Sequence, residues 1–192
     1  ELRASAIVDI YELKALATNN ERRDFVQNFL QALTDAPKSL WQPLLLVLDE
    51  AQLYCPETAR DKNAGPCAAA VIAICARGRK RGFCPVLATQ RLSILSKDAV
   101  SNCHNKLIGL TTLDVDIKRA NAELGFDKAT PPPKPLRRLD PEQGEWYAYG
   151  PAISYDVKLV HVGDVHTTHP KVGQHAKHSS PPPPTEKIRK LL

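Results

Sequence analysis

Runs of apolar residues alternate with helical patterns in the part of the chain that precedes Ala129. Leu44 to Leu48 is a continuous apolar run bounded by Pro43 and Asp49, which is typical of a strand buried on both faces of a parallel sheet. Shorter apolar runs predict further strands at residues 6–10, 83–89 and 106–110. Proline is awkward inside a central strand, so we expect Pro85 at the start of its strand.

Four helices are predicted between and after these strands. Thr18 and Glu21 fit a capping box, with Thr18 at the N-cap and Glu21 at the third helical position. The apolar face of this helix comprises Phe25, Val26, Phe29, Leu30 and Leu33. Residues 64–77 and 98–103 predict two more helices, and Asp114 caps a fourth that ends at Gly125. This alternation predicts an α/β fold built on a parallel sheet.

The composition changes at Ala129. After it come 11 of the 16 prolines and five of the six histidines, with proline-rich joints at residues 131–135 and 181–184. Residues 145–149 and 154–162 predict two strands paired across Gly150 and Pro151. We therefore expect three parts: an α/β core over residues 1–129, a joint with a small β appendage over 130–170, and a His- and Pro-rich tail over 171–192.

The composition limits the class of protein. Hydrophobic residues make up 43% of the chain and charged residues 24%, which permits a buried core and excludes wholesale disorder. No run approaches the roughly 20 apolar residues that a membrane span needs. The five cysteines form no CxxC and are odd in number, so we expect free thiols in a cytoplasmic protein and no disulfide framework.

The positive charge is concentrated in one segment. The net charge is +5, yet residues 62–97 contain seven Lys or Arg and no Asp or Glu, which leaves −2 for the rest. Such a cluster usually meets phosphates of a nucleotide or a nucleic acid, and the alternative is a solvated basic face.

An acidic pair follows the most apolar strand. Asp49 and Glu50 emerge where residues 44–48 end, and ligands of open α/β sheets bind at the carboxyl ends of the strands. In a nucleoside triphosphatase the first acid suits the Mg²⁺ shell and the second can orient and deprotonate the attacking water, as in a Walker B motif. The alternative is an acidic pair that merely ends a buried strand.

The next apolar run also ends in polar residues. Thr89 and Gln90 could hydrogen-bond the γ-phosphate or the attacking water, and Arg91 could read the phosphate state or hold an acid at a subunit boundary. The alternative is that Gln90 simply begins a loop.

A basic turn lies between the two strands. Residues 77–82 place four cations around two glycines at a predicted helix end, a site that suits an arginine finger. For Lys80 and Arg81 we favour a role at the helix C-terminus or contact with DNA backbone.

Taken in order, Asp49-Glu50-Ala51, Gly78-Arg79-Lys80-Arg81-Gly82 and Leu87-Ala88-Thr89-Gln90-Arg91 resemble the HerA/FtsK superfamily of DNA-translocating ATPases. The resemblance covers roughly residues 6–162 and is strongest over 44–95. It implies a RecA-like P-loop fold, ATP and Mg²⁺ as ligands, a homo-oligomeric, hexameric ring, and movement along double-stranded DNA, with a nuclease or a phage or plasmid protein as the candidate partner.

The resemblance also implies residue roles. Asp49 and Glu50 match the Walker B acids, Arg79 the arginine finger and Gln90 the strand-end sensor. The expected DNA-backbone contacts are Arg77, Lys80, Arg81 and Lys97.

One departure from the family is large. The chain contains no G-x-x-x-x-G-K-[ST] and no Met, from which we expect the P-loop to lie upstream of Glu1 and this chain alone to be inactive. The alternatives are a natural pseudo-ATPase that binds DNA or a partner, and a coupling ATPase that moves protein.

Overall fold

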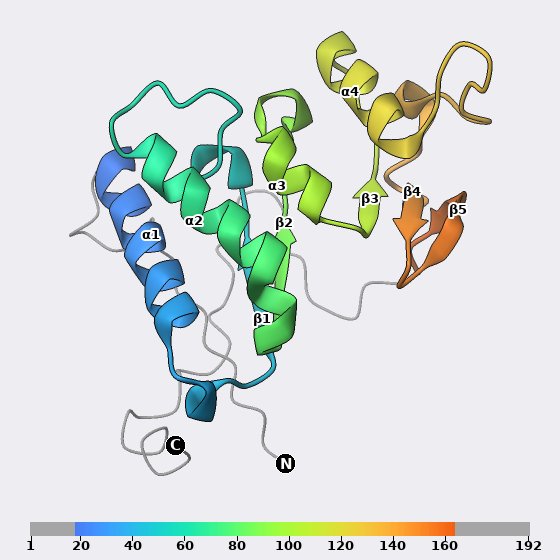
Figure 1. The fold of residues 1–192 in the computed structure, drawn as a ribbon. Coiled ribbons are helices and arrows are strands. Elements are labelled where there is room, and N and C mark those ends of the chain that lie inside the picture. The colour runs from blue at the N-terminus through green and yellow to red at the C-terminus, as the bar shows by residue number, and fades with distance from the viewer. Residues whose placement is uncertain (1–17, 164–192) are drawn as a thin grey trace, which may run out of the picture.

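The computed structural model describes residues 18–163 (Figure 1). Its helices are α1 (Asn19–Asp35), α2 (Ala64–Arg77), α3 (Lys97–Asn102) and α4 (Asp114–Leu124), and its strands are β1 (Leu44–Leu48), β2 (Phe83–Leu87), β3 (Lys106–Ile108), β4 (Glu145–Gly150) and β5 (Ser154–His161). Short 3-10 turns follow β1 at Ala51–Leu53 and α2 at Gly78–Arg81. The strand expected at residues 6–10 and the tail over 171–192 lie outside the described residues.

The protein is α/β, with a small parallel sheet and a separate antiparallel one. β1 and β2 pair in parallel, with Leu44 opposite Phe83 and Leu48 opposite Leu87. α1 and α2 pack side by side against one face of this pair (Figure 1). Their apolar stripes meet Leu46 in the larger hydrophobic core. Because β1 and β2 are parallel, the carboxyl ends of both strands lie at the same edge of the sheet.

Within residues 18–163 the other face of the parallel pair is exposed and is called the open face below, which corrects the expectation of a strand buried on both faces. Leu46 is 9% exposed, whereas its neighbours Leu45 and Val47 are 64% and 62% exposed. Cys84 and Val86, which lie opposite them in β2, are exposed as well. A continuous apolar run indicates only that both faces of a strand can be buried. In this structure α1 and α2 cover one face of β1.

Pro85 lies in the middle of β2 and not at its start. It is opposite Leu46 in the register. The backbone amide of Ala88 and the backbone carbonyl of Gly82 form hydrogen bonds to β1. The even-numbered residues of β2 therefore direct their backbone amides and carbonyls towards β1. The nitrogen of Pro85 therefore points to the outer edge, where no bond of this pair is lost.

The second sheet assembles in the order β3, β4, β5, all antiparallel. The predicted pairing of the last two strands, β4 and β5, is confirmed. β3 pairs with the other edge of β4. Residues 106–110, expected as a further strand of the parallel sheet, instead contain this short edge strand. α4 packs over the second sheet in a separate core, whose buried members are Ala120, Leu124, Leu136, Leu139 and Tyr147. In this core α4 packs with residues that follow the first proline-rich joint.

Most helix signals are confirmed. The capping box of Thr18 and Glu21 is present, and Gly125 ends α4 in the left-handed conformation. Asp114 is not the N-cap: that residue is Leu113, and Asp114 lies in the first turn. Of the apolar face of α1 only Leu30 is buried, while Phe25 and Phe29 are stacked in parallel and partly exposed.

An ion-pair group ties α4 to the edge strand β3. Glu123 accepts hydrogen bonds from Lys106 (2.5 Å) and from Arg119 (2.8 Å). Burial alone would raise the pKa of Glu123, but the two cations outweigh it and hold the pKa below its ordinary value. Across the described residues no helix is both long and apolar enough to span a bilayer.

Candidate functional site

The acidic pair and the polar strand end meet at one edge of the parallel sheet. The amide of Ala88 donates to the carbonyl of Leu48, and the amide of Ala51 donates to the carbonyl of Ala88, both at 2.9 Å. These bonds continue the pairing beyond the strands and hold the two polar segments side by side. Because parallel strands end at the same edge, Glu50 and Gln90 come within contact although 40 positions separate them.

Glu50 is the centre of this edge. Its carboxylate accepts one hydrogen bond on each oxygen, from Gln90 Nε2 at 2.8 Å and from Gln52 Nε2 at 2.6 Å. Among the described residues it alone, apart from glycines, has a positive φ, with φ 48° and ψ 44°. A left-handed backbone costs a non-glycine residue about 1–2 kcal/mol, and such strain tends to occur at functional sites.

Gln52 is a member of the site that the sequence did not reveal. It is 9% exposed and lies between two partners, donating to Glu50 and accepting from the hydroxyl of Thr89. The hydroxyl of Thr89 in turn accepts the amide of Arg91 at 3.0 Å. A polar residue two positions after an acidic pair is a weak signal, because many loops begin in that way. The burial of the Gln52 side chain in the structure distinguishes it from such ordinary loop residues.

Asp49 is exposed beside this network. One of its oxygens accepts the amide of Glu50 at 2.9 Å. No group of three or more His, Cys, Asp or Glu in residues 18–163 could hold a metal by itself. A single exposed carboxylate still fits Mg²⁺ in a nucleotide site, because that ion usually takes one or two carboxylates and completes its shell with water and phosphate.

Arg91 is directed away from the acidic pair. Its Nε lies 3.4 Å from Asp116, which is 2% exposed and also accepts the amide of Ser93 at 2.6 Å. The predicted contact with an acid is therefore made within the chain, to a residue of α4. This pair connects the polar edge of the parallel sheet to α4 and the antiparallel sheet of β3, β4 and β5, which together are called the second unit below.

The basic turn lies at the opposite end of β2. Arg79 and Lys80 belong to the turn that precedes β2, whereas Gln90 follows the strand. A strand of this length spans roughly 16 Å, so Arg79 and Glu50 of one chain cannot share a ligand's phosphate. Arg77, Arg79 and Lys80 are exposed, and the guanidinium of Arg81 lies 5.1 Å from the ring centroid of Trp41.

Lys97 is separate from the basic turn and has a partner. Its Nζ lies 2.9 Å from Glu57, and its amide donates to the same carboxylate at 2.7 Å. The hydrogen bond from the Lys97 side chain lowers the pKa of Glu57. Of the four expected DNA contacts, three therefore share one end of the molecule and Lys97 does not.

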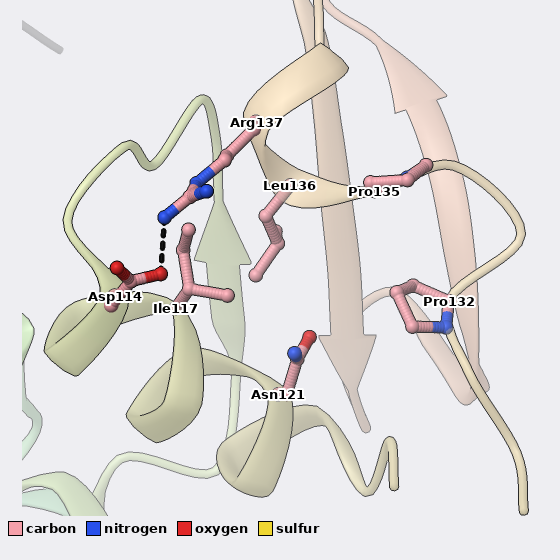
Figure 2. A pocket seen from close by; sticks show the side chains of 7 residues that line it. All are labelled: Asp114, Ile117, Asn121, Pro132, Pro135, Leu136 and Arg137. Atoms are coloured by element: carbon pink, nitrogen blue, oxygen red, sulfur yellow. Dashed lines mark hydrogen bonds and ion pairs between the residues drawn. The ribbon is translucent and has the colours of Figure 1, made fainter. Parts of the chain in front are cut away.

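A shallow hollow lies elsewhere, between α4 and the proline-rich segment (Figure 2). Arg137 and Asp114 form an ion pair at its rim, and Ile117, Asn121 and Leu136 line its floor. None of the residues expected to bind nucleotide or DNA lines this hollow.

No protein-family model matches the chain, and no curated protein is significantly similar to it.

Proposed function

We propose that this chain supplies the water-activating and phosphate-sensing residues of a RecA-like ATPase of the HerA/FtsK type, which uses ATP to move along double-stranded DNA. Glu50 orients and deprotonates the attacking water, and Gln90 senses the γ-phosphate beside it. Gln52 and Thr89 position the Glu50 carboxylate. The 192 residues contain no phosphate-binding loop motif, so the proposal concerns a protein that also carries such a loop.

The observation that carries this proposal is the bond between Glu50 and Gln90 across the two strand ends. Water activation needs a carboxylate held at the edge where ligands of parallel sheets bind, with a polar group from the neighbouring strand next to it. Both requirements are met by residues that the chain places 40 positions apart. The left-handed backbone of Glu50 supports a functional role for this residue, because such strain tends to persist at functional sites.

The cation of such a site would be Mg²⁺, held by Asp49 through water. When bound, the ion supplies charge neutralisation to the triphosphate. Asp49 itself contributes an exposed carboxylate next to Glu50, and its bond to the Glu50 amide fixes the turn that presents both acids.

The position of Arg79 favours a shared site. An exposed arginine that is a strand's length away from Glu50 of its own chain can stabilise transition-state charge only in a neighbouring copy. This supports a ring of identical subunits in which Arg79 of each subunit reaches its neighbour's nucleotide. Arg77 and Lys80, on the same end, would contact DNA phosphates without reading bases.

The test is Glu50→Gln in the protein as its gene encodes it, with Glu142→Gln as the matched control. Glu142 is an exposed acid on the second unit, so its loss should leave turnover unchanged. We expect Glu50→Gln to lower ATP hydrolysis at least a hundredfold while ATP binding persists. Full turnover in Glu50→Gln would refute the role assigned to this residue.

The rival functions give different results in the same protein. A non-catalytic module that binds DNA or a partner would hydrolyse no ATP even with all residues intact. An ATPase that moves protein would turn over ATP without stimulation by duplex DNA. Stimulation by duplex DNA that falls steeply with added salt supports the translocase.

A further inference from the structure

A buried carboxylate of α4 holds the segment that follows Gln90. Asp116 lies in the first turn of α4 and is 2% exposed. One of its oxygens accepts the backbone amide of Ser93 at 2.6 Å, and the other lies 3.4 Å from the Nε of Arg91. A buried carboxylate persists only where such partners compensate for the water it has lost, so Asp116 stays bound to residues 91–93 in the folded protein.

Leu92 lies between the two partners of Asp116 and joins the two hydrophobic cores. Among the described residues it is the one side chain that packs against both of them. Two positions further on, the carbonyl of Ile94 accepts the amide of Glu57 at 2.8 Å. Residues 91–94 therefore contact α4 on one side and the loop between β1 and α2 on the other.

The contact between Gln90 and Glu50 depends on the backbone around Gln90. The Gln90 side chain is exposed and reaches the Glu50 carboxylate at 2.8 Å. Ordering a long, exposed side chain costs conformational entropy comparable to what one hydrogen bond returns, so the bond persists only where the backbone already directs the side chain. The bond of Ala88 to β1 fixes this backbone before Gln90, and the contacts of Asp116 fix it after Gln90.

We propose that Asp116 is a positioning residue of the polar edge: from α4 it directs Gln90 towards Glu50, and through this contact the second unit regulates the site. α4 is packed into the core of the second unit, so the carboxylate moves with that unit. A shift of α4 relative to β2 would pull on residues 91–93 and withdraw Gln90 from Glu50. The consequence for ATP turnover rests on the proposed function, whereas the positioning of Gln90 does not.

A purely structural role for Asp116 leads to a different expectation. In that case Asp116 only satisfies the amide of Ser93, and any acceptor of the same shape replaces it. Asparagine is such an acceptor, because its carbonyl oxygen can serve Ser93 while its NH2 group faces Arg91, which carries donors only. Asp116→Asn therefore removes the contact with Arg91 and retains the one with Ser93, which separates positioning from stability.

The test is the side-chain amide signal of Gln90 in the proton–nitrogen correlation spectrum of the isotope-labelled chain. Glu50→Ala gives the position of this signal when the contact is absent. We expect Asp116→Asn to move the signal at least half of the way to that position, while urea unfolding shows a folded protein. Asp114→Asn is the matched control: Asp114 lies on the same turn of α4 but pairs with Arg137, so its replacement should leave the signal in place (Figure 2).

Arg91→Gln tests the same contact from its solvent-exposed side. The Arg91 side chain is 47% exposed, so its replacement should leave the fold intact. We expect the Gln90 signal to move in the same direction, and the double variant with Asp116→Asn to move it no further than Asp116→Asn alone, because both changes remove one contact. If Asp116→Asn leaves the signal at its wild-type position, the proposal is overturned; should that variant not fold, Arg91→Gln decides in the same way.

The kinetic consequence is measured in a protein that also carries a phosphate-binding loop. Because Asp116→Asn leaves Asp49 and Glu50 in place, it should lower kcat by about tenfold to a hundredfold and leave the KM for ATP unchanged. An unchanged kcat beside an active wild type overturns the proposal. A wild type that hydrolyses no ATP refutes the proposed function alone, and the Gln90 signal then still decides whether Asp116 positions Gln90.

Discussion

Leu45 and Leu46 are neighbours in β1 whose side chains lie on opposite faces of the parallel pair. Leu46 is 9% exposed beneath α1 and α2, whereas Leu45 is 64% exposed on the open face. Replacing either by alanine removes the same atoms from the same strand, with the same loss of strand propensity. The difference between the two variants therefore reports how deeply each face is buried.

The expected difference follows from the two exposures. They differ by about half of a leucine side chain, which corresponds to roughly 1.3 kcal/mol of transfer free energy. Leu46→Ala also leaves a cavity under packed helices, which adds about 1–2 kcal/mol. We expect Leu46→Ala to lower the free energy of unfolding by about 3 kcal/mol and Leu45→Ala by no more than about 1 kcal/mol.

Urea unfolding followed by circular dichroism measures both variants against the wild type. A lower midpoint at an unchanged denaturant slope identifies a pure stability change. Equal losses for Leu45→Ala and Leu46→Ala would refute the reasoning, because they would mean that the open face is packed in the folded protein.

Three further predictions concern the second unit and its link to the first. Gly150 has φ 128°, and a Cβ there would lie 2.3 Å from the carbonyl oxygen of His104, so Gly150→Ala should lower the free energy of unfolding by more than about 2 kcal/mol. Gly125 has φ 75° and open space around the position of a Cβ, so Gly125→Ala should lower it by only about 1 kcal/mol in the same urea assay. Asp116→Ala should cost about 1–3 kcal/mol because a backbone amide loses its acceptor, and Asp116→Asn should restore most of that loss. The pKa of Glu123 is lower in the folded state, so the stabilisation from its ionised carboxylate is present above the unfolded value of about 4.5 and is lost as the pH falls through the folded value. The stability difference between wild type and Glu123→Gln should therefore be large at pH 7 and shrink below pH 4. Thermal melts over this pH range measure that difference.

The sequence predicted helices better than it predicted packing. The capping box of Thr18 and the terminal glycine of α4 act within a few residues, so their signals are local and are confirmed. The apolar run of β1 identified a strand, but it could not state which face the helices cover. Likewise Lys106–Ile108 looked like any short strand, and its partner β4 is fixed only by contacts with residues about 40 positions later.

The candidate site was predictable to the extent that parallel strands share an edge. The sequence put Glu50 and Gln90 at the carboxyl ends of two predicted strands, and the structure brings the two side chains into contact. It could not identify Gln52, because burial of that side chain depends on how the turn after β1 folds back. Nor could it foresee that Arg91 pairs with Asp116, which lies on a helix of the other unit.

The left-handed backbone of Glu50 has a consequence for attempts to improve this protein in the laboratory. Glycine and asparagine adopt that conformation more cheaply than glutamate does. A library selected for heat resistance alone should therefore drift towards glycine or asparagine here and discard the carboxylate, while a selection that demands turnover should retain it. A difference between the residues that the two selections retain at position 50 would show whether Glu50 is kept for the fold or for its chemistry.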